Sequence, residues 1–167
     1  MIFLTLGTTS YPFKRLLGGV DQALISLKSK EILFAQIGVN DYHFRYPHVR
    51  EFREIPFGRM INLIMSSRVV VAHGGFGTAL LCLSYSKHKP VLVPRIKKLG
   101  EHVDDHQVFL VDYLAEKKLA KGILPQDNFI EKLVDFLKYP QAVISMKSDR
   151  QKLIEKLCDY TNKLSVN

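Results

Sequence analysis

The chain has 167 residues, of which 47% are hydrophobic, and it carries a formal net charge of +8 with a pI near 9.5. This length suits one domain with a real core, and we interpret residues 1–167 as that single domain. A long apolar run, and a basic leader followed by a small-residue cleavage site, are both absent from the sequence. We therefore expect no transmembrane span and no secretory signal, and we predict a cytoplasmic protein.

The excess of basic residues indicates an anionic partner, which can be nucleic acid, lipid headgroups or a phosphorylated small molecule. No predicted helix combines a basic face with interleaved aromatic residues, so we do not expect nucleic acid. The two cysteines, Cys82 and Cys158, are far apart and form no C-x-x-C motif. This arrangement predicts buried thiols rather than a disulfide framework or a zinc ribbon.

The chain begins with the predicted strand Ile2–Leu6, which a Gly-Thr-Thr-Ser turn ends. Apolar residues at helical spacing follow from Phe13 to Leu24, with Pro12 predicted in the first turn. The turn has two interpretations. Its backbone N–H groups and the hydroxyls of Thr8, Thr9 and Ser10 can hold a phosphate at the helix start, or Thr9 or Ser10 can simply cap the helix.

The next segments alternate between strand and helix patterns. Residues 32–38 form a predicted strand, residues 40–48 a loop and residues 49–55 a short strand. A helix is predicted from Phe57 to Ile64, and the apolar strand Val69–Ala72 comes after it. This βαβαβ alternation with short connections indicates an α/β fold, a single Rossmann-like, doubly wound, mostly parallel sheet.

A glycine-rich turn, His73 to Thr78, follows the strand at residues 69–72 and runs into an apolar helix. Gly74, Gly75 and Gly77 allow positive φ angles and a close approach of the backbone to a ligand. Together with the start of the helix, such a turn can hold a diphosphate on amide donors. The spacing is neither G-x-G-x-x-G nor a Walker loop, which argues against NAD and ATP.

A second polar loop follows the predicted strand Pro90–Pro94. His102 and His106 are four residues apart, so one helical face can ligate a metal, but the sequence indicates no third ligand. A capped helix start is another interpretation. We favour sugar recognition, because the side chains of Asp105 and Gln107 offer the paired hydrogen bonds that hydroxyl-rich ligands require. No metal and no other cofactor is expected.

Beyond this loop, the pattern predicts a helix over residues 108–114, an edge strand over residues 120–124 and a helix over residues 129–137 that ends before Pro140. A last helix, from Lys147 to Leu164, has an apolar face and a basic face. It can pack on the core, or it can dock on a partner or near a membrane surface.

In their order, three segments resemble one known family: I-F-L-T-L-G-T-T-S-Y-P-F at residues 2–13, V-V-V-A-H-G-G-F-G-T-A at residues 69–79, and P-V-L-V-P-R-I-K-K-L-G-E-H-V-D-D-H-Q at residues 90–107. The chain resembles the PssE-type small subunits of bacterial exopolysaccharide and capsule glycosyltransferases. That family is related to the C-terminal domain of glycosyltransferase family 28 and to the donor-binding subunit of the eukaryotic dolichol-linked N-acetylglucosaminyltransferase.

The resemblance implies the C-terminal half of a GT-B glycosyltransferase, which binds a UDP-sugar without a metal. The residues that it assigns to the donor site are Gly7, Thr8 and Thr9 in the cleft, His73, Gly74, Gly75, Gly77 and Thr78 at the diphosphate, and Glu101, His102, Asp105, His106 and Gln107 around the sugar. Related enzymes often place a ribose-binding glutamate in the helix after the glycine turn. Here Leu80, Leu81 and Cys82 stand there, so the ribose contact is unassigned.

The resemblance further implies a two-chain, inverting enzyme. Its partner is a membrane-anchored, acceptor-binding (PssD-type) subunit that supplies the general base and recruits this chain to the cytoplasmic membrane. The acceptor is a polyprenyl-diphosphate-linked glycan. We expect UDP-galactose as donor. The alternatives are UDP-glucuronate, for which Lys97, Lys98 or His102 can offer a cation, and UDP-N-acetylglucosamine. A non-catalytic nucleotide-binding or scaffold protein is the rival interpretation.

Overall fold

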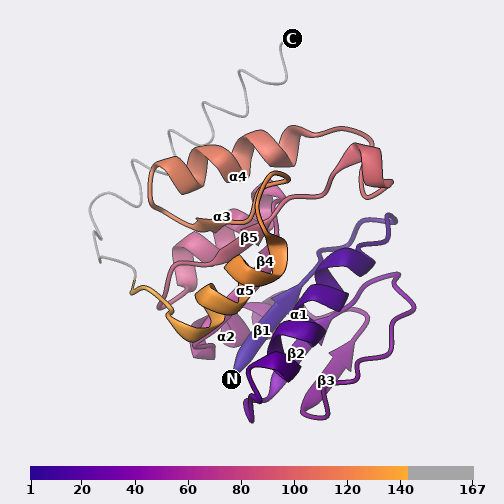
Figure 1. Cartoon of the computed structure of the whole chain (residues 1–167), viewed down its shortest axis with the longest axis vertical. Coiled ribbons are helices and arrows are strands. Elements are labelled where there is room, and N and C mark those ends of the chain that lie inside the picture. The colour runs from indigo at the N-terminus through magenta and orange to yellow at the C-terminus, as the bar shows by residue number, and fades with distance from the viewer. Residues whose placement is uncertain (143–167) are drawn as a thin grey trace.

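The computed structural model of the chain describes residues 1–142, and in this part the strands form one parallel sheet in the order β3-β2-β1-β4-β5-β6 (Figure 1). The elements in chain order are β1 (Ile2–Thr5), α1 (Lys14–Ser26), β2 (Leu33–Gln36), β3 (Val49–Phe52), α2 (Phe57–Ser66), β4 (Val69–His73), α3 (Phe76–Tyr85), β5 (Val91–Val93), the 3₁₀ turn η1 (Lys97–Leu99), α4 (His106–Glu116), β6 (Lys121–Gly122) and α5 (Phe129–Lys138).

The strand order confirms the predicted doubly wound fold. The chain starts at the middle of the sheet, builds outward from β1 to β3, and then returns to the other side of β1 for β4, β5 and β6. This 3-2-1-4-5-6 order is that of the Rossmann fold. The predicted strand at residues 120–124 is the short edge strand β6. The predicted helix at residues 147–164 lies outside the described residues.

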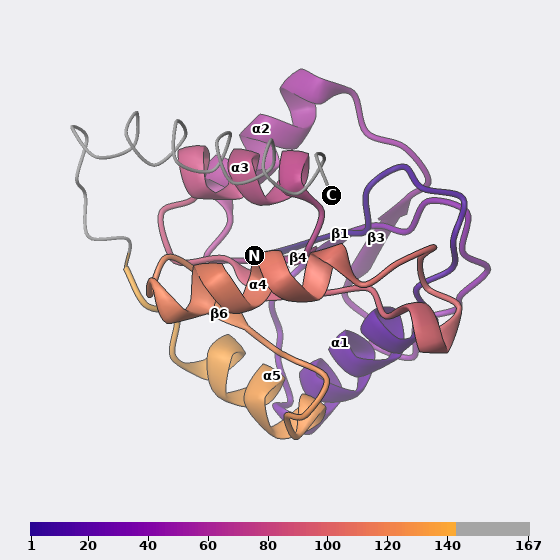
Figure 2. The same cartoon turned by 90° about the horizontal axis from the view of Figure 1, so that it is seen from above.

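Helices cover both faces of the sheet, because successive strand residues point to opposite sides. Ile2 and Leu4 of β1 join one core cluster with α1 and α5. Phe3, which lies between them in sequence, joins a second cluster with α2, α3 and α4. Figure 2 shows α2 and α3 on one side of the sheet and α1 and α5 on the other. Both faces are therefore buried, which explains the near-continuous apolar strands.

Two local details differ from the sequence prediction. Helix α1 begins at Lys14 after the N-cap residue Phe13, so Pro12 lies before the first turn instead of within it. No side chain caps this helix. The interpretation in which Thr9 or Ser10 caps α1 is wrong, because the loop takes several more residues to reach the helix.

Cys82 is fully buried as a free thiol, as predicted, and burial raises its pKa to about 12. Cys158 lies outside the described residues. Within residues 1–142, no helix has both the length and the apolar character needed to cross a membrane.

Candidate functional site

The donor cleft that the resemblance implies belongs where β1 and β4 run side by side and the chain leaves them toward opposite faces of the sheet, and we call this place the crevice. Thr5 of β1 registers with Ala72 of β4, so Gly7 and His73 follow at the same edge. The helices that come next, α1 and α3, belong to different core layers. Ligands of open α/β sheets bind at such a switch point, outside the carboxyl ends of the strands.

His73 fills the floor of this crevice. Its residue is 8% exposed, and its ring lies between two glycines: a Cβ at Gly7 would lie 2.5 Å from its Cε1, and a Cβ at Gly75 would lie 2.3 Å from its Nε2. Nδ1 is buried and has no hydrogen-bond partner among residues 1–142. Burial, and then the nearby charge of Arg95, lower the pKa of His73 to about 4. The imidazole is therefore neutral at physiological pH.

The glycine turn is built differently from the prediction. Gly75, the N-cap residue of α3, has φ −72°, and among the described glycines a positive φ occurs only at Gly7, Gly38 and Gly100. The expectation of positive φ at Gly74, Gly75 and Gly77 is therefore wrong.

The first two positions of the turn require glycine because neighbouring side chains lie too close for a Cβ. A Cβ at Gly74 would lie 2.5 Å from Val111 Cγ2, and one at Gly75 would meet His73. Gly77 differs from both, because a Cβ there would meet no atom within 4 Å. Gly77 is exposed in the first turn of α3, and Thr78 beside it is half-buried. No side chain caps α3, so its first N–H groups face the crevice end of the helix without a capping oxygen.

The β1–α1 loop forms the other wall. Gly7 has φ +71°, a conformation that favours glycine. Thr8 is exposed, and Thr9 is half-buried with its hydroxyl oxygen 3.4 Å from the backbone N of Tyr11, whose N–H it accepts. Gln36 donates to the carbonyl oxygen of Gly7 at 3.3 Å, which fixes the start of the loop.

A buried arginine joins this wall to the loop after β5. Arg95 is 1% exposed, and its guanidinium donates to the carbonyl oxygens of Leu6, Tyr11, Pro12 and Glu101 at 2.9–3.2 Å. It also lies over the ring of Phe13 at 4.6 Å. Burial lowers the pKa of Arg95 to about 10, so the side chain keeps its charge at neutral pH.

Three of the predicted sugar-binding residues hold the loop itself. Both carboxylate oxygens of the buried Glu101 accept from Arg15 at 2.9 Å, and one also accepts from the N–H of Ile96 at 3.0 Å. Asp105 accepts from the N–H of Lys97 at 2.8 Å. Gln107, which is 3% exposed, accepts from the N–H of Arg95 at 3.1 Å. The interactions of Glu101 and Gln107 are thus largely internal.

The two histidines of the loop lie side by side, although not on one helical face. His106 is the first residue of α4, whereas His102 lies in the loop before it, 5.8 Å from the ring of Tyr11. Their ring centroids are 4.9 Å apart and their planes nearly perpendicular. Asp104 lies between them in sequence and contacts Nδ1 of His106.

The sequence analysis missed Arg95, Arg15 and Asp104 as parts of this site. Arg95 had one visible signal: an arginine directly after an apolar strand, where it has to be buried and needs partners. Arg15 lies in α1, whose sequence was interpreted only for its apolar spacing. Asp104 lies in the polar loop whose sequence indicated no third ligand beside the two histidines.

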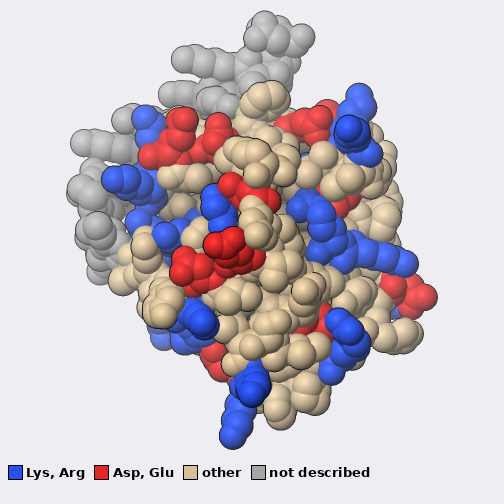
Figure 3. All heavy atoms as spheres, in the orientation of Figure 1, with Lys and Arg blue, Asp and Glu red and all other residues tan. Residues whose placement is uncertain are grey.

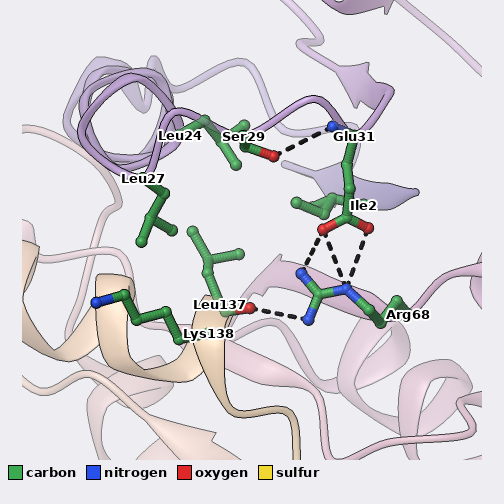
Figure 4. Close-up of a pocket in the computed structure, with 8 residues that line it drawn as sticks. All are labelled: Ile2, Leu24, Leu27, Ser29, Glu31, Arg68, Leu137 and Lys138. Carbon is green, nitrogen blue, oxygen red and sulfur yellow. Dashed lines mark hydrogen bonds and ion pairs between the residues drawn. The ribbon is translucent and has the colours of Figure 1, made fainter.

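A second hollow lies at the opposite, amino-terminal edge of the sheet (Figure 4). It has a volume of about 300 Å³ and is lined by Ile2, Leu24, Leu27, Ser29, Glu31, Arg68, Leu137 and Lys138. Its two central charges neutralise each other, because Arg68 pairs with Glu31 and also donates to the carbonyl oxygen of Leu137. It contains none of the predicted site residues.

Basic and acidic side chains are interspersed on the face shown in Figure 3. The net charge of +8 is therefore not gathered into one patch there. Recognition of an anion at the crevice has to rely on particular donors rather than on a broad positive field.

Comparison with known proteins identifies the family of the chain. The model of the glycosyltransferase family 28 C-terminal domain matches residues 1–159, nearly the whole chain. The chain belongs to this family. No curated protein matches the sequence closely enough to count as a relative.

Among solved structures, one titled "Crystal Structure Analysis of the Glycotransferase of kitacinnamycin" is similar to this family 28 domain, with a TM-score of 0.57 and 18% identity. The match covers 80% of this chain and 32% of that one, so the chain spans about a third of the length of that protein. At this identity the similarity concerns the fold, and it supports the assignment to one half of a GT-B architecture.

Proposed function

We propose that this family 28 domain is the donor-binding part of an inverting glycosyltransferase that uses a UDP-sugar. The observation that carries the proposal is the crevice at the switch point, where the uncapped amino end of α3 lies beyond His73 and the β1–α1 loop forms the opposite wall. Family membership supports a sugar donor as its ligand.

In this proposal the diphosphate of UDP lies at the amino end of α3. The free N–H groups of the first turn and the positive end of the helix dipole favour a negative charge there. Gly77 has open space beside it, so the phosphate oxygens can approach the backbone closely. The hydroxyls of Thr8 and Thr9, in the β1–α1 loop, are proposed as further donors to the same phosphates.

The reaction then follows from where charge develops. An acceptor hydroxyl attacks the anomeric carbon as the bond to the UDP oxygen breaks, and the departing UDP gains negative charge. Donors fixed at the amino end of α3 stabilise that charge in the transition state more than in the ground state. His73, neutral at physiological pH, adds no positive charge, and its ring occupies the space between Gly7 and Gly75. The proton of the acceptor passes to a base that we assign to the partner.

The partner is proposed to be a membrane-anchored, acceptor-binding subunit of the PssD type, which makes this chain the PssE-type subunit. Large apolar side chains are exposed after strands of the sheet: Val39 after β2, Phe57 at the start of α2, Leu99 in η1 and Val103 in the loop after it are 53–65% exposed. These exposed side chains support a protein surface closing over the crevice. We propose a polyprenyl-diphosphate-linked acceptor in exopolysaccharide or capsule synthesis.

A matched pair of glycines tests the diphosphate position. Gly77 and Gly58 are each the second residue of a ten-residue helix, and a Cβ at either would meet no atom within 4 Å. Valine should therefore leave the fold intact at both. Gly77→Val should weaken UDP binding by about 2 kcal/mol or more, on the scale of losing hydrogen bonds to a charged group. Gly58→Val should bind UDP as the unmodified chain does.

Isothermal titration calorimetry with UDP provides the measurement. If Gly77→Val keeps the affinity of the unmodified chain, or if the unmodified chain binds no UDP, the donor site is elsewhere and the proposal fails. Equal losses in both variants would indicate a general effect on the helices rather than a contact with the ligand.

Testing the donor sugar and the partner requires the two-chain enzyme. We propose UDP-galactose as the donor, and the isolated chain should transfer little sugar because one domain provides no acceptor wall. Co-expression with the partner should restore transfer, and competition among UDP-sugars should favour UDP-galactose. Robust transfer by the isolated chain to a lipid-linked acceptor would contradict the split arrangement, and a preference for UDP-glucuronate would contradict the choice of sugar.

A further inference from the structure

Three side chains before and at the start of α4 direct their ligand atoms toward one point. His102, Asp104 and His106 each offer a nitrogen or a carboxylate oxygen, and these atoms all lie within 4.8 Å of one another. Both histidines use Nδ1 toward the same oxygen of Asp104: His102 Nδ1 lies 3.4 Å from Oδ1, and His106 Nδ1 contacts it. The sequence provided two of these ligands, and the fold supplies the third.

A helix cap explains only part of this arrangement. Oδ1 of Asp104 accepts from the backbone N–H of His106 at 3.2 Å, which is an ordinary role for an aspartate before a helix. That role does not involve His102. Its Nδ1 is buried and makes no hydrogen bond in the described part of the chain, although it lies beside a carboxylate. A buried polar atom left in this way costs free energy unless something binds it.

We propose that His102, Asp104 and His106 bind a divalent transition-metal ion, with Zn²⁺ as the best fit. Two imidazoles and a carboxylate suit Zn²⁺, and ligands at 2.0–2.2 Å from a tetrahedral ion are roughly 3.4 Å apart. The separation of His102 Nδ1 and Asp104 Oδ1 is 3.4 Å, whereas His106 Nδ1 is in direct contact with that oxygen and has to move away from it for both to bind one ion. The side chains of Asp104 and His106 are 52% and 48% exposed, so an ion has a path from solvent and positions open for water.

The role that follows is structural. An ion here ties the loop after β5 to the first turn of α4, beside Tyr11 of the β1–α1 loop. Glu101 already fixes one end of the stretch between η1 and α4 through Arg15, Arg95 and Ile96, and Asp105 fixes the other end through the N–H of Lys97, so an ion would hold the residues between them. The inference concerns ion binding by this chain and does not depend on the proposed function. It departs from the expectation, drawn from the sequence, that no metal is bound.

A second His–Asp pair in the same chain provides a matched control. His43 and Asp41 are two residues apart, as are His106 and Asp104, and their charged atoms lie 4.0 Å apart on the surface. That pair has no third ligand among the residues that the structure describes. If Zn²⁺ needed only a surface histidine beside an aspartate, replacing His43 and replacing His106 would weaken its binding equally.

Calorimetric titration of the full chain with Zn²⁺, and visible absorption with Co²⁺, test the site. The unmodified chain should bind one equivalent, and His102→Ala, Asp104→Ala and His106→Ala should each weaken binding by at least about 100-fold, beyond the 10–100-fold typical of losing an outer-shell partner. His43→Ala should change nothing. Zn²⁺ should raise the melting temperature of the unmodified chain but not of the His102→Ala chain.

The proposal is overturned if the unmodified chain shows no saturable Zn²⁺ binding at micromolar concentration. It is also overturned if His102→Ala binds as tightly as the unmodified chain, because the buried nitrogen is the observation that distinguishes this cluster from a helix cap. Equal weakening by His43→Ala would assign the ion to surface histidines in general. UDP binding is measured separately, because the proposed donor site can be correct even if the chain binds no metal.

Discussion

Arg95, at the end of β5, donates a hydrogen bond to the carbonyl oxygen of Leu6, at the end of β1, with 3.0 Å between nitrogen and oxygen. The two residues are 89 positions apart in sequence, and β4 lies between their strands in the sheet. The same guanidinium holds the carbonyl oxygens of Tyr11 and Pro12. One side chain thus fixes the first crevice loop to the second.

Replacing Arg95 with methionine should destabilise the protein by about 3 kcal/mol or more, because several buried carbonyl groups lose their partner at once. Arg53→Met is the matched control. Arg53 is exposed, and among the described residues its side chain makes one hydrogen bond, to the carbonyl oxygen of Gly38 at 3.3 Å, so its loss should cost less than about 0.5 kcal/mol. Urea unfolding measures both. Similar values for the two variants would show that Arg95 is not a structural clamp.

His73 should make stability depend on pH. Its pKa is about 4 in the folded protein and 6.5 as its ordinary value, because burial disfavours the charged ring. Between these values the unfolded chain binds a proton that the folded chain does not. Stability should therefore be complete above pH 6.5 and fall as the pH drops toward 4, by up to about 3 kcal/mol.

The variant His73→Asn isolates this effect, since asparagine does not titrate in this range. Free energies of unfolding measured from pH 7 to pH 4.5 should fall more steeply for the unmodified chain than for the variant, whatever their absolute difference. Parallel curves would mean that His73 keeps an ordinary pKa. An NMR titration of the ring would report the same value directly.

Two neighbouring glycines in α1 should respond in opposite ways to alanine. A Cβ at Gly19 would lie 2.0 Å from Cε1 of Phe129 in α5, whereas a Cβ at Gly18 would meet only the hydroxyl of Tyr42, at 3.6 Å. Gly18→Ala should stabilise the helix by up to about 1 kcal/mol. Gly19→Ala should destabilise by about 1–3 kcal/mol through overpacking. Thermal unfolding measures both, and a stabilising Gly19→Ala would show that α5 moves freely away from α1.

The fold was readily predicted from the sequence because its signals are local. Apolar runs such as Val69–Ala72, ended by glycine or proline, define the strands and their alternation with helices. The strand ends were overestimated: residues 49–55 were predicted as strand, but β3 ends at Phe52. Ile55 lies in the connection after β3, yet it is buried as a strand residue would be. An apolar residue at this position therefore did not mark the end of the strand.

The site was predicted less completely, because its contacts are between residues far apart in sequence. The partners of Arg95 at Tyr11 and Pro12 are 84 and 83 positions away, and no pattern along the chain pairs them. The glycine turn was recognised, but its conformation was not. A glycine can be required by positive φ or by a close neighbour, and only the fold decides between the two at Gly75.

The ring of His73 between Gly7 and Gly75 also limits how this family can vary. The missing side chains of the two glycines provide the space that the imidazole occupies. Relatives that carry a larger residue at either glycine position should therefore carry a smaller one in place of His73, so that the three positions change together while the volume they share stays constant. A substitution at one of them alone should be harmful, and a compensating substitution at another should restore the fold. We therefore expect a loop glycine, a strand histidine and the N-cap glycine of α3 to vary as one unit.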